Sequence, residues 1–230
     1  RLARAELEGL EAPGAALSGI ELAGACLRSA QLDAADLSGA NLSRSDLRGA
    51  SLRGAKLVLA LAQAADLSKA DLRGASLEGA AFGSANLSGA RLEGALLHSA
   101  RLEGAVLRGA LLDNADLSAA QLSTAVLAEA SMVGTNLTGA LLDGVDLRHA
   151  RLDTRRFAGA SLARCNLEEV NIDAPDFSRA DLHEALLSGS RFPRALLHAA
   201  NLSGAGLAAW KGWPSPNSPA SRTSSGKART

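Results

Sequence analysis

The sequence contains no tyrosine, and its four phenylalanines and two tryptophans bring the aromatic share of its 230 residues to only 3%. So few aromatic side chains exclude the mixed aromatic and aliphatic interior of an ordinary globular domain. Hydrophobic residues nevertheless make up 47% of the chain, which is enough apolar material for a sizeable core. The sequence therefore predicts a core built from a repetitive set of small and aliphatic side chains.

Long apolar runs and a charge imbalance are missing as well. No stretch approaches the ~18 to 20 uninterrupted apolar residues of a membrane span, and no apolar signal core follows a basic start. The formal net charge is 0, which disfavours a strongly basic nucleic-acid binder and a strongly acidic protein alike. We therefore expect a soluble, cytoplasmic protein with no membrane partner and no direct nucleic-acid partner. A targeting segment or a further domain ahead of Arg1 stays an open alternative.

The composition also favours one kind of source organism. Arginine outnumbers lysine by 20 to 4, and alanine and glycine are abundant. This bias is typical of a GC-rich bacterial gene, so we expect a bacterial protein.

What the chain does contain is a repeat with a period of five residues. Of the 42 positions in this frame from Leu2 to Leu207, only Ala12 and Ala62 lack a large apolar side chain. The position two before each of these centres is alanine at 31 of 41 sites, and the position two after is glycine at 19 of 42 sites. Asp or Asn is favoured just before the centre. The repeating unit is therefore Ala-Asp/Asn-Leu-x-Gly.

This period argues against an α-helix, although alanine and leucine are good helix formers. Successive centres would be rotated by about 140° around a helix of 3.6 residues per turn, so no apolar stripe would form. A strand that alternates with a period of two fails for the same reason. A coil that turns a corner once per unit fits the pattern, with Leu and Ala inward and Gly as the left-handed residue of a type II turn.

The unit and its continuous frame resemble the pentapeptide-repeat family over residues 2–207. The resemblance implies an all-β fold, namely a right-handed quadrilateral parallel β-helix with four units per coil and about ten coils, or roughly 50 Å of rod. We expect this solenoid to occupy residues 1–209, with a C-terminal cap near Trp210 and Trp213. Residues 214–230 are basic, rich in Ser and Pro and without large apolar side chains, so we expect a disordered tail.

Irregular units are the places where a regular rod can carry function. In the stretch 57–63 the inward site shrinks to Ala62, while Val58, Leu59 and Leu61 take outward phases. This pattern predicts either a degenerate coil or five-residue loop that preserves the frame, or an apolar surface patch that binds a protein partner.

A second irregularity is basic. Arg155 falls on the inward small site, where an unpaired guanidinium cannot be buried, so we expect the corner to open there. Two hypotheses remain for Arg155 and its neighbour Arg156, a local bulge in solvent or a contact with an anion or partner. A third irregularity, from Val170 to Pro175, predicts a reshaped corner only.

The ends of the rod are the remaining candidate surfaces. An uncovered β-helix terminus exposes core side chains and unpaired strand edges. Trp210 and Trp213 follow directly after the last centre, where they would cover the open end as a cap or bury it against a second copy. A homodimer through a solenoid end is therefore one expected assembly.

Side chains that carry enzyme chemistry do not converge in this frame. His98 and His198 share a face but lie five coils apart, roughly 24 Å, and no second histidine or cysteine stands at ligand spacing. Cys26 points outward and Cys165 inward about seven coils away, too far for a disulfide. We therefore expect a non-enzyme with no catalytic residue, no metal site, no cofactor and two free thiols.

The resemblance also implies one specific alternative function. Strongly acidic members of the family act as DNA mimics that bind DNA gyrase or topoisomerase and confer quinolone or toxin resistance, which requires a dense anionic face. Here residues 1–209 hold 20 basic and 24 acidic side chains, and outward rows mix signs, as in Asp33, Arg53, Arg73 and Glu93. We therefore favour a protein-interaction module or structural spacer with an unknown protein partner, either alone or as part of a longer chain, over a gyrase-binding DNA mimic.

Overall fold

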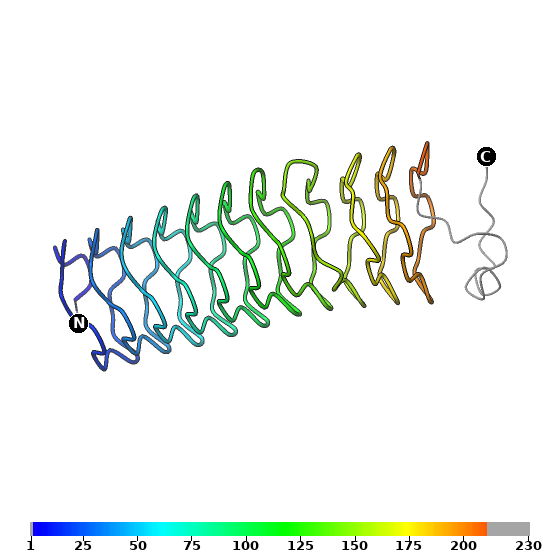
Figure 1. The fold of residues 1–230 in the computed structure, drawn as a ribbon. Helices are drawn as coiled ribbons and strands as arrows, with labels where there is room; N and C mark the ends of the chain where they lie inside the picture. The colour runs from blue at the N-terminus through cyan, green and yellow to red at the C-terminus, as the bar shows by residue number, and fades with distance from the viewer. Residues whose placement is uncertain (1, 211–230) are drawn as a thin grey trace.

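A computed structural model describes residues 2–210, which wind into a rod of stacked coils with residue 2 and residue 210 at opposite ends of the rod (Figure 1). Every fifth residue forms a parallel bridge with the residue 20 positions later, so each coil contains four five-residue units. The four resulting ladders run along the rod as ladder A from Glu6 to Gly206, ladder B from Glu11 to Arg191, ladder C from Ala16 to Leu196 and ladder D from Glu21 to Asn201.

The regular secondary structure of residues 2–210 consists of these single bridging residues, and the described part of the chain contains no helix. Three backbone hydrogen bonds per regular unit connect neighbouring coils, and one of them is donated by the residue two after the centre, as from Gly39 to Val58 at 2.8 Å. The N–H of each centre donates to a carbonyl 19 residues later, as from Leu37 to Lys56 at 2.7 Å. The N–H of each bridging residue donates to a carbonyl 21 residues earlier, as from Asp36 to Ala15 at 2.9 Å.

A tight turn separates one unit from the next. The N–H of the small residue donates to the carbonyl of the centre three residues earlier, as from Ala40 to Leu37 at 2.9 Å. The residue directly before the small residue has a positive φ at 40 of the 42 sites from residue 4 to residue 209, and glycine occupies 19 of these 40. Glycine is favoured here because any other residue pays about 1–2 kcal/mol for the left-handed conformation. The 21 other residues at these sites show that the ladders offset this cost.

The centres and the small residues fill the interior together, as the repeat predicts. Leu107 and Ala110 are typical, since both are completely buried. Alanine lets opposite walls approach one another, and leucine fills the space between them. Ala62 is also completely buried, so the smaller centre in the stretch 57–63 keeps its inward direction.

The preference for Asp or Asn just before the centre has a local cause. The side-chain oxygen of this bridging residue accepts a hydrogen bond from the N–H two residues later, as Asp66 does from Ser68 at 2.9 Å. Asn86 makes the same contact to Ser88 and also donates its amide to the Asp66 carboxylate at 3.1 Å. Asp and Asn therefore satisfy turn donors that the ladders leave unused.

The rod contains one dislocation, visible as a wider loop where the colour in Figure 1 passes from green to yellow. Ladder A lacks the bridge between Val126 and Asp146, and ladder B lacks the bridge between Arg151 and Asn171, whereas ladders C and D continue past both places. His149 and Thr154 are the two turn residues in the frame without a positive φ. The regular turn is absent across residues 152–155, as expected from the arginine at the inward site.

The same corner is irregular in the next coil too. Pro175 has no N–H, so residues 172–175 cannot close the turn with the usual hydrogen bond. Aromatic side chains fill the interior beside these two corners, with ring centroids of Phe157 and Phe177 at 5.0 Å and of Phe177 and Phe192 at 5.3 Å. The two irregularities that the sequence marks separately therefore lie on one corner in consecutive coils.

Candidate functional site

The stretch 57–63 is a regular coil, so the loop alternative is wrong. Ala60 closes the usual turn onto Leu57 at 3.0 Å, and the N–H of Leu61 donates to the carbonyl of Ala40 at 2.9 Å. Leu59 and Leu61 point outward with 65% and 40% of their surfaces exposed, while Val58 is half-buried. We call Val58, Leu59 and Leu61 the apolar patch.

Leu59 owes its position to a glycine in the next coil. Leu59 adopts the left-handed conformation with φ +56°, and its Cδ2 atom lies 2.9 Å from where a Cβ atom on Gly79 would stand. A side chain at position 79 would displace Leu59, so this glycine makes room for the leucine. The apolar patch is therefore shaped by two neighbouring coils.

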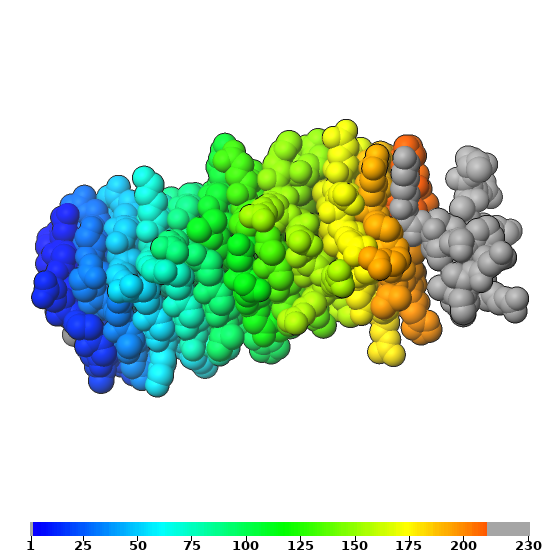
Figure 2. All heavy atoms as spheres, in the orientation of Figure 1, coloured from blue at the N-terminus to red at the C-terminus, as the bar shows by residue number. Residues whose placement is uncertain are grey.

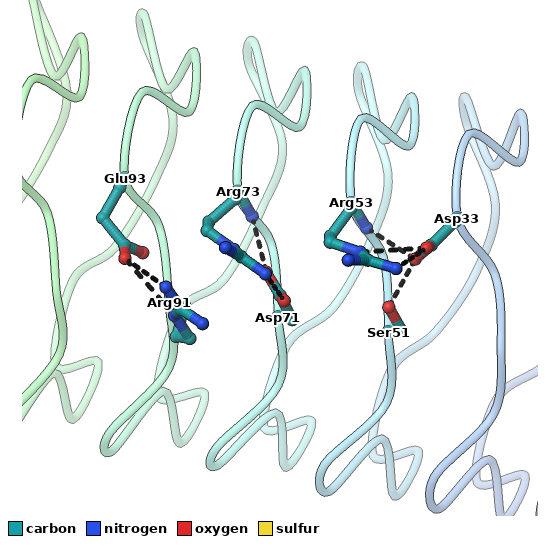
Figure 3. Close-up of polar contacts among 7 residues, drawn as sticks. All are labelled: Asp33, Ser51, Arg53, Asp71, Arg73, Arg91 and Glu93. Carbon is teal, nitrogen blue, oxygen red and sulfur yellow. Dashed lines mark hydrogen bonds and ion pairs between the residues drawn. The ribbon is translucent and has the colours of Figure 1, made fainter.

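Charges along the corner between ladders B and C are paired with their neighbours (Figure 3). Arg53 contacts Asp33 at 2.7 Å between coils, and Arg91 contacts Glu93 at 2.9 Å within a unit. Arg73 forms a two-pronged pair with Asp71, and its guanidinium lowers the pKa of the Asp71 carboxyl below the ordinary value. Each arginine in this close-up therefore has a carboxylate beside it, and the signs along the corner are mixed, as the outward row predicts.

Similar pairs recur elsewhere on the surface. They are Arg28–Glu8, Arg48–Asp46, Arg108–Glu129, Arg148–Asp146 and Arg194–Asp173. The side chains in these pairs are largely exposed, and such pairs contribute little to stability. Their main effect is on the electrostatic potential, because each carboxylate has a cation next to it. The face of the rod drawn in Figure 2 carries projecting side chains and no deep cleft.

The open corner at residues 152–155 forms a pocket of about 300 Å³ lined by Asn114, Gly134, Asp153, Thr154, Arg155 and Arg156. Arg155 and Arg156 are both exposed, and Thr154 is buried at the inward side with 2% of its surface exposed. The Arg155 guanidinium contacts Asp173 at 3.2 Å. The expected opening is thus present, and Thr154 takes the inward place of Arg155, which the repeat does not predict.

Asn114 and Gly134 were not singled out as site residues either. They precede Thr154 by 40 and 20 residues and therefore occupy the same corner in the two preceding coils. The 20-residue spacing of the repeat is the signal that could have joined them to Arg155 and Arg156.

Trp210 is the last described residue of the rod, is half-buried and packs against the core. Its backbone N–H donates to the carbonyl of Leu207 at 3.1 Å. Trp213 and the expected tail at residues 214–230 lie outside the described residues. The cap formed by both tryptophans stays a prediction.

The two cysteines are free. Cys165 is buried and donates its thiol to the carbonyl of Leu142 at 2.8 Å, and burial raises the pKa of this thiol to about 12. Among residues 2–210 no three His, Cys, Asp or Glu side chains gather as a metal-binding group, and no helix of this part is long and apolar enough to span a membrane.

The model of the pentapeptide repeats matches residues 1–39, 25–61, 63–98, 90–127, 120–154, 156–189 and 176–207. The chain belongs to the pentapeptide-repeat family. Between residues 1 and 207 this match skips only residues 62 and 155, which are the shrunken centre beside the apolar patch and the arginine at the open corner. Both skipped residues lie in irregular units of the frame, whereas the third irregularity, from Val170 to Pro175, lies within a matched range.

Two solved structures of pentapeptide-repeat proteins resemble the chain. HetL, involved in heterocyst differentiation regulation in the cyanobacterium Nostoc sp. strain PCC 7120, is 31% identical over 91% of each chain, with a TM-score of 0.46. QnrB1, a plasmid-mediated fluoroquinolone resistance protein, is 19% identical over 82% of this chain and 89% of its own, with a TM-score of 0.52. The family and the QnrB1 structure imply a right-handed quadrilateral β-helix. No curated protein matches the chain.

Proposed function

We propose that this pentapeptide-repeat protein is a non-enzymatic, cytoplasmic protein-interaction module of about ten coils. The observation that supports this function is the apolar patch. Leu59 and Leu61 lie two residues apart with 65% and 40% of their surfaces exposed. Apolar side chains gathered on the surface of a rigid scaffold are typical of protein-binding sites.

The charge pattern favours this function over DNA mimicry. A mimic must present carboxylates at a density near one charge per 1.7 Å of duplex, without cations beside them. On this rod arginines stand next to several of the carboxylates, as Arg53 does to Asp33 and Arg73 to Asp71 (Figure 3). A form bound to gyrase would have to break these ion pairs or leave the arginines facing the DNA-binding site of gyrase.

The experiment is capture of partners from a bacterial lysate on the immobilised protein, followed by affinity measurement with each purified partner. A variant that combines Leu59→Ser with Leu61→Ser should bind the partner at least about tenfold more weakly, because each buried leucine contributes roughly 1.5–3 kcal/mol. Leu141→Ser is the matched control, since Leu141 lies on ladder D, as Leu61 does, and is 41% exposed.

The other outcomes identify other functions. A partner that binds the double variant as tightly as the parent would exclude the apolar patch as its site. Enrichment of gyrase together with inhibited supercoiling would establish the DNA mimic instead. Capture of no protein by the parent would overturn the interaction module in favour of a structural spacer.

A further inference from the structure

The pocket at the open corner collects polar side chains that the fold itself does not use. Within residues 2–210 no hydrogen bond or ion pair involves the Arg156 guanidinium, the Asn114 side-chain amide or the Asp153 carboxylate. At the corner in Figure 3, by contrast, the charged side chains are paired with one another. The pocket of about 300 Å³ holds the volume of roughly ten water molecules, so a small ligand fits among these groups.

Arg155 is held loosely enough to turn toward a ligand. Its one ion pair is the 3.2 Å contact to Asp173, and 65% of its side chain is exposed. Arg194 holds the same carboxylate by two shorter contacts of 2.6 and 2.5 Å. Asp173 therefore keeps Arg194 as its partner when Arg155 moves away, so the movement leaves the Asp173 carboxylate paired.

Backbone N–H groups at this corner are further hydrogen-bond donors, beside the two guanidinium groups. In a regular corner the residue two after the centre donates its N–H to the next coil, as Gly39 does. The residue three after the centre donates its N–H to the carbonyl of the centre, as Ala40 does. At the open corner Thr154 and Arg155 hold these places, and within residues 2–210 their N–H groups have no hydrogen-bond partner. Successive free amides in an irregular turn form concavities that bind anions.

Gly134 lets the pocket take its shape. A Cβ atom at this position would lie 2.5 Å from Oδ1 of Asn114, so only glycine allows the asparagine to lean across it. The Asn114 amide thereby reaches the corner from two coils away and lines the same pocket as Arg155 and Arg156.

Asp153 restricts which anion this pocket can accept. A carboxylate beside the ligand repels a fully deprotonated anion, but it accepts a hydrogen bond from an anion that still carries an O–H proton. The arginines supply the charge-assisted donors that phosphoryl oxygens require. We propose that the open corner binds a phosphate group that retains an O–H proton, either as the inorganic ion or as a monoester in its singly ionised form.

The test is a titration of the whole protein with inorganic phosphate, sulfate and methyl phosphate at pH 5.5, followed by calorimetry and by the NMR signals of the amides of residues 153–156. Inorganic phosphate should bind saturably and shift these amides, and sulfate, which has no proton at this pH, should bind at least about tenfold more weakly. Binding of methyl phosphate would identify a monoester as an accepted source, and its failure beside phosphate binding would restrict the site to the free ion.

Three variants make the assignment specific. Arg155→Gln combined with Arg156→Gln should weaken phosphate binding at least about tenfold, because charge-assisted hydrogen bonds are lost. Asp153→Asn should bring phosphate and sulfate to within about threefold of each other. Arg101→Gln is the control, since Arg101 is exposed on ladder D, away from the pocket.

The proposal is overturned if the parent binds neither anion, if it binds both equally, or if the arginine variant with an unchanged melting temperature binds phosphate like the parent.

Discussion

The hydroxyl of Thr154 donates a hydrogen bond to the backbone carbonyl of Thr135, one coil earlier, at the corner where the frame places an arginine on the inward side. Both threonines are buried, with 2% and 0% of their surfaces exposed. In a regular unit such a carbonyl receives the N–H of the bridging residue 21 positions later, which here is Arg156. Its N–H instead lies 3.3 Å from the Thr154 hydroxyl oxygen. The bridge between Asn136 and Arg156 on ladder C is kept, and the Thr154 side chain replaces one of its usual backbone hydrogen bonds.

This relationship predicts that Thr154→Val destabilises the protein by about 1–3 kcal/mol. Valine keeps the shape of threonine but leaves the buried carbonyl of Thr135 without a donor. Thr138→Val is the control, because Thr138 is exposed and its hydroxyl has no partner within the described chain. Urea unfolding of both variants measures the difference, and equal midpoints would show that this hydrogen bond does not stabilise the corner.

The interior makes a second prediction, which tests the inward direction of the small residues. Ala110→Leu should lower the free energy of unfolding by about 1–3 kcal/mol, because the completely buried site has no room for three more carbon atoms. Ala16→Leu should have little effect, since Ala16 is exposed on ladder C, where Leu96 and Leu196 are also exposed. Thermal melts that show the same loss for both variants would contradict the packing described above.

Much of this architecture follows from the period of five alone. The inward direction of Leu107 and Ala110 is fixed by phase, and the opening at Arg155 follows because a guanidinium cannot be buried without a partner. The mixed charges of the corner in Figure 3 are also readable as a row of residues 20 apart.

Other features depend on contacts that a single unit does not encode. The break in ladder A between Val126 and Asp146 occurs in units that match the repeat, so it arises from the neighbouring distortion at His149 and Thr154. The position of the Leu59 side chain depends on Gly79 in the next coil, because a Cβ atom there would lie 2.9 Å from Cδ2 of Leu59.

The space at Gly79 provides a third prediction. Gly79→Ala and Gly74→Ala both place alanine in the left-handed conformation, at φ +63° and +62°, which costs about 1–2 kcal/mol. Only the Cβ atom at position 79 meets Leu59, so only Gly79→Ala should displace that side chain and weaken partner binding at the apolar patch. Comparison of the two variants in a melt and in the binding assay separates these effects, and equal binding would show that the position of Leu59 is immaterial.

The cysteines provide a fourth prediction. At pH 8 a thiol reagent should label one cysteine in the folded protein and two in denaturant, because the thiolate is the reactive form and burial raises the pKa of Cys165 to about 12. Cys26 is only partly buried and should account for the label on the folded protein. In Cys26→Ser the folded protein should remain unlabelled, and fast labelling of this variant would contradict the burial of Cys165.

The last prediction concerns acid. Hydrogen bonds, in most cases from an arginine, lower the pKa of several carboxyls below their ordinary values; these include Asp36, Asp46, Asp71, Asp146 and Asp173. Because the folded-state value is the lower one, the unfolded chain binds protons first as the pH falls. The stabilisation is complete above the ordinary value near 3.9 and is lost as the pH drops through the folded-state pKa. The melting temperature should therefore stay level from pH 8 to about 5 and fall below about pH 4.

Asp71→Asn isolates one of these carboxyls. Asparagine still accepts the backbone N–H of Arg73, as Asn86 does from Ser88, but it cannot form the ion pair and does not titrate. The variant should melt below the parent at pH 7, and the two melting temperatures should converge as the pH falls below about 3. A gap that stays constant from pH 7 to pH 2 would mean that the charge of Asp71 contributes nothing and that its role is confined to the hydrogen bond of the turn.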